Sequence, residues 1–171
     1  MNELEQVWAQ KLDEARAKAQ TTGRADVAEY LNLRATNDLI RQTSVNWLLE
    51  SLLEIAAEAI RGVVNITIET EHQHRFQFGN SNLAGSLVRL SQGVRCLTVE
   101  AGWTRAPADG FMRGGALAVA RIAHFGMSKH NVELLLIQSD DSLNWFAVDN
   151  DGKRDLFNAK NLQRHFQILT G

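Results

Sequence analysis

Residues 63–78 read VVNITIETEHQHRFQF, and this stretch decides the fold because the spacing of apolar residues changes here. The even positions from 64 to 78 hold Val, Ile, Ile, Thr, His, His, Phe and Phe, whereas the odd positions hold polar residues throughout. Strict alternation with a period of two is typical of strands that have one solvent-exposed face. The chain is therefore expected to form strands from residue 63 onward.

The residues before this stretch predict helices. Residues 1–62 contain no proline and two glycines, Gly23 and Gly62, each at a place where a helix should stop. Patterns that resemble a capping box occur at Asn2–Glu5 and at Asp26–Glu29. We expect helices at about 3–21, 27–36 and 38–61. The sequence ATND at 35–38 leaves open whether the second and third are separate.

The segment 38–61 is apolar around most of its circumference. Its polar residues recur at every fourth position, as Gln42, Asn46, Glu50, Glu54 and Glu58. A surface helix normally has one apolar stripe, whereas this one has one polar stripe, so Trp47, Leu48 and Leu52 need cover. We expect a homodimer through the 38–61 helix. In the alternative, the 27–36 helix folds back and completes the cover within one chain.

Turn residues organise the second half of the chain into an antiparallel meander. Asp140–Asp141 suits a tight turn that pairs Leu136 with Trp145 and Leu134 with Ala147. Asp151–Gly152 is a strong hairpin signal, and it predicts pairing of Phe146 with Phe157 and of Asp149 with Arg154. Further strands are expected at about 83–90, 94–104, 132–138, 143–149 and 153–157. Residues 116–125 fit a strand or a helix, with the strand favoured, and 158–169 should form a closing helix.

Together these elements predict an α+β fold. N-terminal helices (about 3–61) should pack on an antiparallel, mostly meander β-sheet of six to eight strands (about 63–157), with a closing C-terminal helix. We expect a single domain over 1–171, divided into a helical segment, 1–62, and a sheet with its C-terminal helix, 63–171.

Composition excludes several classes of function. The net charge of −2 argues against a general affinity for nucleic acid, which needs a basic surface. The N-terminus shows no secretory signal pattern, and no apolar run approaches the length of about 18 residues that spans a membrane. We therefore expect a soluble cytoplasmic protein with no nucleic-acid or membrane partner.

The histidines at 72 and 74 raise the question of a metal site. Pairing even positions with even positions requires a three-residue loop at Glu71–Gln73, which sets Thr70 opposite His74, Ile68 opposite Phe76 and Ile66 opposite Phe78. Glu69 would then face Arg75 across the strands. Zinc needs at least three protein ligands, and Glu71 alternates to the other face. We expect no metal site, and a polar turn instead.

Other local motifs are incomplete. Cys96 lies in an apolar strand, where a free cysteine is usually inert. DNDG at 149–152 lacks the carboxylates that a calcium loop needs at its first and twelfth positions. GFMRGG at 110–115 matches neither the Walker spacing nor the dinucleotide-binding fingerprint. We expect no cofactor, and we predict no catalytic residue.

The segment Trp103–Gly115, WTRAPADGFMRGG, is the candidate binding loop. It holds the only proline of the chain, and long loops on a rigid sheet often carry binding groups. Its candidate ligand-binding residues are Trp103, Arg105, Phe111 and Arg113, because two arginines suit a small anionic ligand.

Two functions follow from these observations. The first is a non-enzymatic interaction or regulatory module that self-associates. The alternative is a small-ligand-binding or enzymatic domain with a pocket between sheet and helices, gated by the Trp103–Gly115 loop. A metal protein that uses His72 and His74 ranks last.

Overall fold

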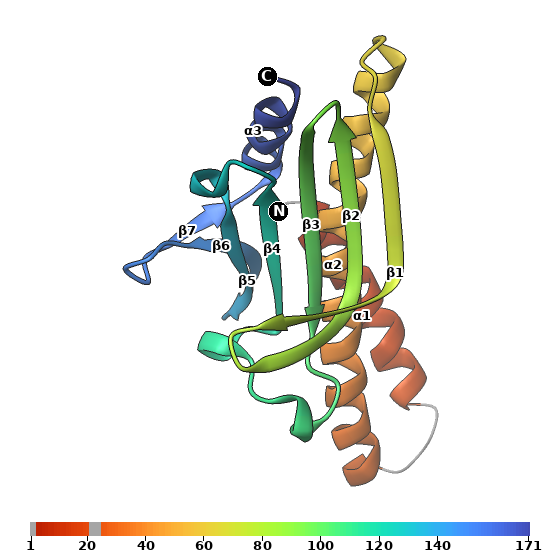
Figure 1. Cartoon of the computed structure of the whole chain (residues 1–171). Coiled ribbons are helices and arrows are strands. Elements are labelled where there is room, and N and C mark those ends of the chain that lie inside the picture. Colours follow the sequence, from red (N-terminus) through yellow and green to blue (C-terminus); the bar gives the residue numbers. More distant parts are fainter. Residues whose placement is uncertain (1–2, 21–24) are drawn as a thin grey trace.

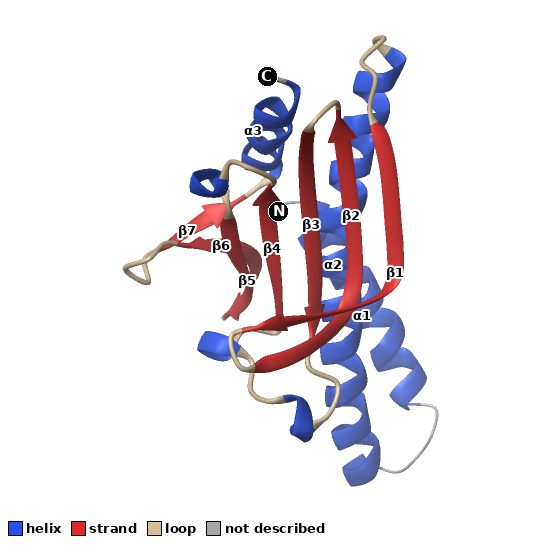
Figure 2. Ribbon diagram, viewed as in Figure 1, coloured by secondary structure: helices blue, strands red, loops and turns tan. Residues whose placement is uncertain are grey.

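The computed structural model describes residues 3–20 and 25–171, and it confirms the predicted α+β architecture (Figures 1 and 2). Two helices, α1 (Glu3–Gln20) and α2 (Ala25–Arg61), precede an open seven-stranded antiparallel sheet in meander order, and α3 (Ala159–Thr170) follows it. The strands are β1 (Thr67–Phe78), β2 (Ser81–Gln92), β3 (Arg95–Trp103), β4 (Ala118–His124), β5 (Val132–Ser139), β6 (Ser142–Val148) and β7 (Arg154–Phe157).

The second and third predicted helices are one helix. α2 runs without a break through residues 35–38, so the separate helices at 27–36 and 38–61 are wrong, as is the alternative in which the first folds back. The segment contains no glycine or proline, and Asp38 forms an ion pair with Arg41 one turn later, at 3.0 Å. Predicted helix boundaries at Asn2 and Gly23 lie outside the described residues.

The apolar circumference of α2 is covered largely within one chain. Leu48 and Leu52 are fully buried in a core formed by α1, α2, α3 and one face of the sheet, which we call the helix-covered face. The expectation that these two side chains need a second copy is therefore wrong. Trp47 is half-buried, so part of this helix still meets the surface.

The predicted hairpin turn at Glu71–Gln73 is wrong, because β1 is a single bent strand. Thr67 to Glu71 pair with Ser91 to Leu87, and His74 to Phe78 pair with Gly85 to Ser81. Two β1 residues between these blocks, His72 and Gln73, therefore oppose one β2 residue, Ser86. Such a β-bulge bends a strand and increases its twist. The real turn lies at Gly79–Asn80, with φ of 62° at Gly79.

The bulge also changes which face the even positions of β1 occupy. Ile68 pairs with Leu90 of the helix-covered core, whereas Phe76 packs in a second apolar cluster with Phe78 and Leu83. Figure 1 shows the tip of the β1–β2 hairpin crossing the opposite face of the sheet, which we call the hairpin-covered face. Packing of Phe76, Phe78 and Leu83 in this second cluster therefore holds the bent hairpin against the hairpin-covered face.

Of the two strand registers predicted from aspartate turns, one is confirmed and one is wrong. Leu136 pairs with Trp145 and Leu134 with Ala147, as the Asp140–Asp141 turn predicts. The register predicted from Asp151–Gly152 is wrong by one residue, because Trp145, not Phe146, opposes Phe157. The cause is the Asp149 carboxylate, which accepts hydrogen bonds from the backbone N–H groups of Asp151 and Lys153 and closes a longer loop.

The ambiguous segment 116–125 contains strand β4, as favoured, and the closing helix is α3. Asn158 begins α3 by accepting hydrogen bonds from the backbone N–H groups of Lys160 and Asn161.

Candidate functional site

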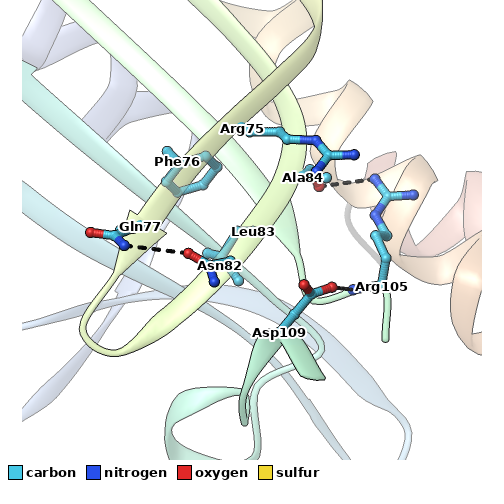
Figure 3. Close-up of a pocket in the computed structure, with 8 residues that line it drawn as sticks. All are labelled: Arg75, Phe76, Gln77, Asn82, Leu83, Ala84, Arg105 and Asp109. Atoms are coloured by element: carbon cyan, nitrogen blue, oxygen red, sulfur yellow. Dashed lines mark hydrogen bonds between the residues drawn. The ribbon is translucent and has the colours of Figure 1, made fainter. Parts of the chain in front are cut away.

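The bent hairpin and the β3–β4 loop enclose a cleft of about 340 Å³ (Figure 3). Two hydrogen bonds join its walls: the Ser81 hydroxyl donates to the Phe111 carbonyl at 2.7 Å, and the Arg105 guanidinium donates to the Ala84 carbonyl at 2.9 Å. The cleft is lined by Arg75, Phe76, Gln77, Asn82, Leu83, Ala84, Arg105 and Asp109. Its polar lining consists of two cations, two amide side chains and one carboxylate, that of Asp109.

Arg105 is held in position by its neighbours. Its guanidinium carbon lies 3.7 Å from the ring centroid of buried Trp103, a cation–π contact. Partial burial lowers the pKa of Arg105, the negative charge of Asp38 raises it, and the positive charge of Arg41 lowers it. The side chain is therefore an exposed cation that the Trp103 ring and the Ala84 carbonyl hold in a fixed orientation, a condition that favours binding of an anion.

Asp109 supports the loop from within. Its carboxylate accepts hydrogen bonds from the backbone N–H groups of Arg105 and Ala106, at 3.1 and 3.0 Å. These bonds close the 3₁₀ turn Pro107–Asp109 and draw the carboxylate to the loop backbone.

Arg75 is the second cation of the cleft, and its side chain donates no hydrogen bond to, and forms no ion pair with, a described residue. The predicted pairing of Glu69 with Arg75 is wrong, because no turn lies between them and both belong to the single strand β1. Glu69 instead meets Arg89 at 3.0 Å. An exposed arginine beside a cleft without a partner in the described chain is available for a ligand.

The structure does not gather the four predicted loop residues into one place. Trp103 and Arg105 come together, whereas Phe111 is 93% exposed and does not line the cleft. Arg113 forms an ion pair with Glu133 of β5 at 3.5 Å. The sequence analysis did not identify Arg75, Gln77 and Asn82 as lining residues. The signal that could have placed them was Gly79–Asn80, a glycine-containing turn between two alternating segments, because it brings these residues onto one hairpin.

A chain of hydrogen bonds and ion pairs fixes the bent hairpin on the hairpin-covered face. His74 Nε2 lies 2.7 Å from the Glu100 carboxylate, which also receives a hydrogen bond from Arg121 at 3.1 Å. Arg121 lies over the ring of Phe78, 5.2 Å from its centroid, and 3.9 Å from Glu133. This network holds the hairpin wall of the cleft, so His74 has a structural role here.

A buried histidine pair, which the sequence analysis did not identify, joins β4 to α3. His124 Nε2 lies 2.8 Å from His165 Nδ1, and His130 is edge-on to His124 with ring centroids 5.8 Å apart. Burial, with smaller contributions from His124, His130 and Arg164, lowers the pKa of His165 to about 4. Burial, followed by the effect of His130, also lowers the pKa of His124. Both rings are therefore neutral at pH 7. The available signal was position: His165 lies on the buried face of α3, and His124 ends the largely buried strand β4.

Within residues 3–20 and 25–171, no group of three or more His, Cys, Asp or Glu side chains is placed to hold a metal ion. Cys96 is half-buried, with its Sγ 3.8 Å from the hydroxyl oxygens of Ser91 and Thr98. None of the described helices is both long and apolar enough to cross a bilayer.

The geometry defines an α+β protein with an arginine-lined surface cleft. Comparisons of the chain with models of protein families, with curated proteins and with solved structures found no match.

Proposed function

We propose that this protein is a non-enzymatic binding module whose cleft holds a small anionic group, a carboxylate or a phosphate. The single observation that carries the proposal is that Arg75 and Arg105 line one cleft, which the amides of Gln77 and Asn82 line as well. Guanidinium groups suit planar carboxylates and phosphates because they donate two parallel hydrogen bonds. Regulation by such a ligand is compatible with a cytoplasmic location, which stays a prediction.

Contacts within the protein fix the walls of the cleft before any ligand binds. Trp103 and the Ala84 carbonyl hold Arg105, while the His74–Glu100–Arg121 network holds the hairpin that carries Arg75. A ligand would therefore order few additional side chains, which reduces the entropic cost of binding.

Arg75→Gln and Arg105→Gln should each weaken binding of inorganic phosphate and of malonate by about tenfold or more, because a hydrogen bond to a charged group contributes roughly 1.5–3 kcal/mol. Titration calorimetry at constant ionic strength measures the effect. Arg113→Gln is the matched control, since it lies in the same loop but outside the cleft. The proposal is overturned if neither anion binds saturably, or if the control loses as much affinity as the cleft variants.

We further propose, as a second property, that the module forms a homodimer through the Trp47 side of α2, within residues 38–61. Half-buried Trp47 lines an apolar groove of about 340 Å³ together with Leu4, Trp145, Leu156 and Phe157. Leu156 is 52% exposed at its rim. A second copy can place its own rim in this groove around a two-fold axis, which makes the contact self-complementary.

Analytical ultracentrifugation across a hundredfold dilution near micromolar concentration should detect a species heavier than the 19.1 kDa chain. Leu156→Glu should shift the equilibrium to the monomer without unfolding, because this side chain is half exposed. Phe111→Glu, at an exposed site outside the groove, should leave the mass unchanged. A wild type that is monomeric at every concentration refutes the dimer.

A further inference from the structure

Three connections at one end of the sheet each expose a large apolar side chain. Val63 follows α2 and is 93% exposed, Val94 lies in the β2–β3 turn and is 92% exposed, and Phe125 follows β4 and is 76% exposed. Thr67 at the start of β1 pairs with Ser91, and the Phe125 N–H donates to the Cys96 carbonyl, so the three connections are neighbours. Figure 1 shows these connections at the end of the molecule where the chain terminates.

The backbone at Val63 is unfavourable for valine. The Val64 N–H donates to the Ala59 carbonyl and the Val63 N–H to the Ile60 carbonyl, which is the Schellman pattern at a helix end. Val63 therefore takes the left-handed position, with φ of 75°, where glycine is strongly preferred. Gly62 stands one residue too early to occupy it. A β-branched residue that is both strained and almost fully exposed indicates a requirement other than stability.

The charge of these connections is uniformly positive. Segments 61–66, 93–95 and 125–131 contain Arg61, Arg95 and Lys129 and no aspartate or glutamate. The connections at the other end of the sheet carry three aspartates, Asp109, Asp140 and Asp141, together with two arginines, Arg105 and Arg113. The β6–β7 turn, which holds two further aspartates, points away from the three connections because the sheet twists (Figure 1).

We infer that this end of the molecule, formed by segments 61–66, 93–95 and 125–131, docks on an anionic lipid surface. Val63, Val94 and Phe125 lie on three separate connections, which we call the apolar tips. Lipid molecules can rearrange around each inserted side chain, so a lipid surface does not require the three tips to form one continuous patch. The cations between them complement the charge of anionic headgroups, and each contributes to attraction near such a surface.

Two of the cations, Arg61 and Arg95, also stabilise the ends of helices, but this structural role does not explain the exposed apolar side chains. Arg61 lies in the last turn of α2, and Arg95 donates to the carbonyls of Ile168 and Leu169 in the last turn of α3, where positive charge is favourable. Neither contact covers Val94 or Phe125. The inference revises the expectation of no membrane partner: the contact lies at the membrane surface and needs no spanning helix.

Co-sedimentation with vesicles tests the inference. The full chain should bind vesicles of phosphatidylcholine mixed with phosphatidylserine, bind pure phosphatidylcholine vesicles at least tenfold more weakly, and dissociate at high salt. Phe125→Ser and Val94→Ser should each weaken binding by about tenfold, because each removes an apolar side chain that enters the interface. Phe111→Ser is the matched control, since Phe111 is 93% exposed on a loop at the other end.

Val63→Gly separates lipid binding from folding. Relief of the left-handed strain should raise the melting temperature by roughly 2–4 °C, while loss of the side chain weakens vesicle binding. Absence of binding to anionic vesicles overturns the inference, as does an equal loss in Phe111→Ser. Binding that is unchanged in all three tip variants overturns it as well. A fall in oligomer mass in the tip variants without lipid would assign these side chains to contact between copies.

Discussion

Acidification from pH 6.5 to pH 4 should lower the free energy of unfolding by about 3 kcal/mol through His165 alone. In the folded chain this ring takes up a proton only near pH 4, because burial and, to a lesser extent, the neighbouring His124, His130 and Arg164 lower the pKa of His165. In the unfolded chain it takes up a proton near pH 6.5. Between these values the unfolded state binds more protons, so stability is complete above pH 6.5 and is lost as the pH falls. His124 acts in the same direction.

The measurement is urea unfolding at pH 7 and at pH 4, for the wild type and for the variant His165→Asn. Asparagine carries no proton in this range and presents an amide close to the position of Nδ1, so the variant should lose distinctly less stability on acidification than the wild type. His72→Asn, at an exposed position of β1, should follow the wild type. If His165→Asn and the wild type lose the same stability, the acid sensitivity arises elsewhere, for example from carboxylates.

Gly85→Ala should cost about 3 kcal/mol of stability and distort the binding cleft. Gly85 pairs with Gly102 across β2 and β3 and with His74 beside the bulge. A Cβ atom at Gly85 would lie 1.8 Å from the Ala101 carbonyl oxygen, and one at Gly102 would lie 2.5 Å from the Ala84 carbonyl oxygen. Both contacts are with backbone, which cannot move aside without opening the sheet. The bend of the hairpin thus depends on two glycines facing each other.

Thermal and urea unfolding of Gly85→Ala measure this cost. Gly62→Ala is the control, because its added Cβ meets the Ala59 carbonyl oxygen at 3.4 Å, close to an ordinary contact, and should change stability by less than about 0.5 kcal/mol. A folded Gly85→Ala variant should also bind phosphate more weakly, since the hairpin carries Arg75. Equal stability of Gly85→Ala and the wild type would mean that the strands do not approach so closely.

The sequence by itself determined the elements whose cause is local. Alternation, the Asp140–Asp141 turn and the apolar face of α3 predicted the strands, one hairpin register and the closing helix, because burial periodicity and turn chemistry act within a few residues. It also identified the β3–β4 loop, whose Arg105 lines the cleft. It misplaced Glu71–Gln73 because a bulge preserves the alternation in the sequence while exchanging the faces of the strand.

Only the tertiary structure decided which distant residues meet. The partnership of Arg75 with Arg105, the His124–His165 pair and the cluster of three apolar tips each join segments more than 20 residues apart along the chain. No local pattern links such segments, since their distances follow from the register and twist summed over several strands. A one-residue bulge or a one-residue slip in a loop changes all of these distances together. For that reason the sequence predicted the helices and the sheet of this protein. The position of the candidate cleft depends on the bend in the β1–β2 hairpin, which the sequence did not predict.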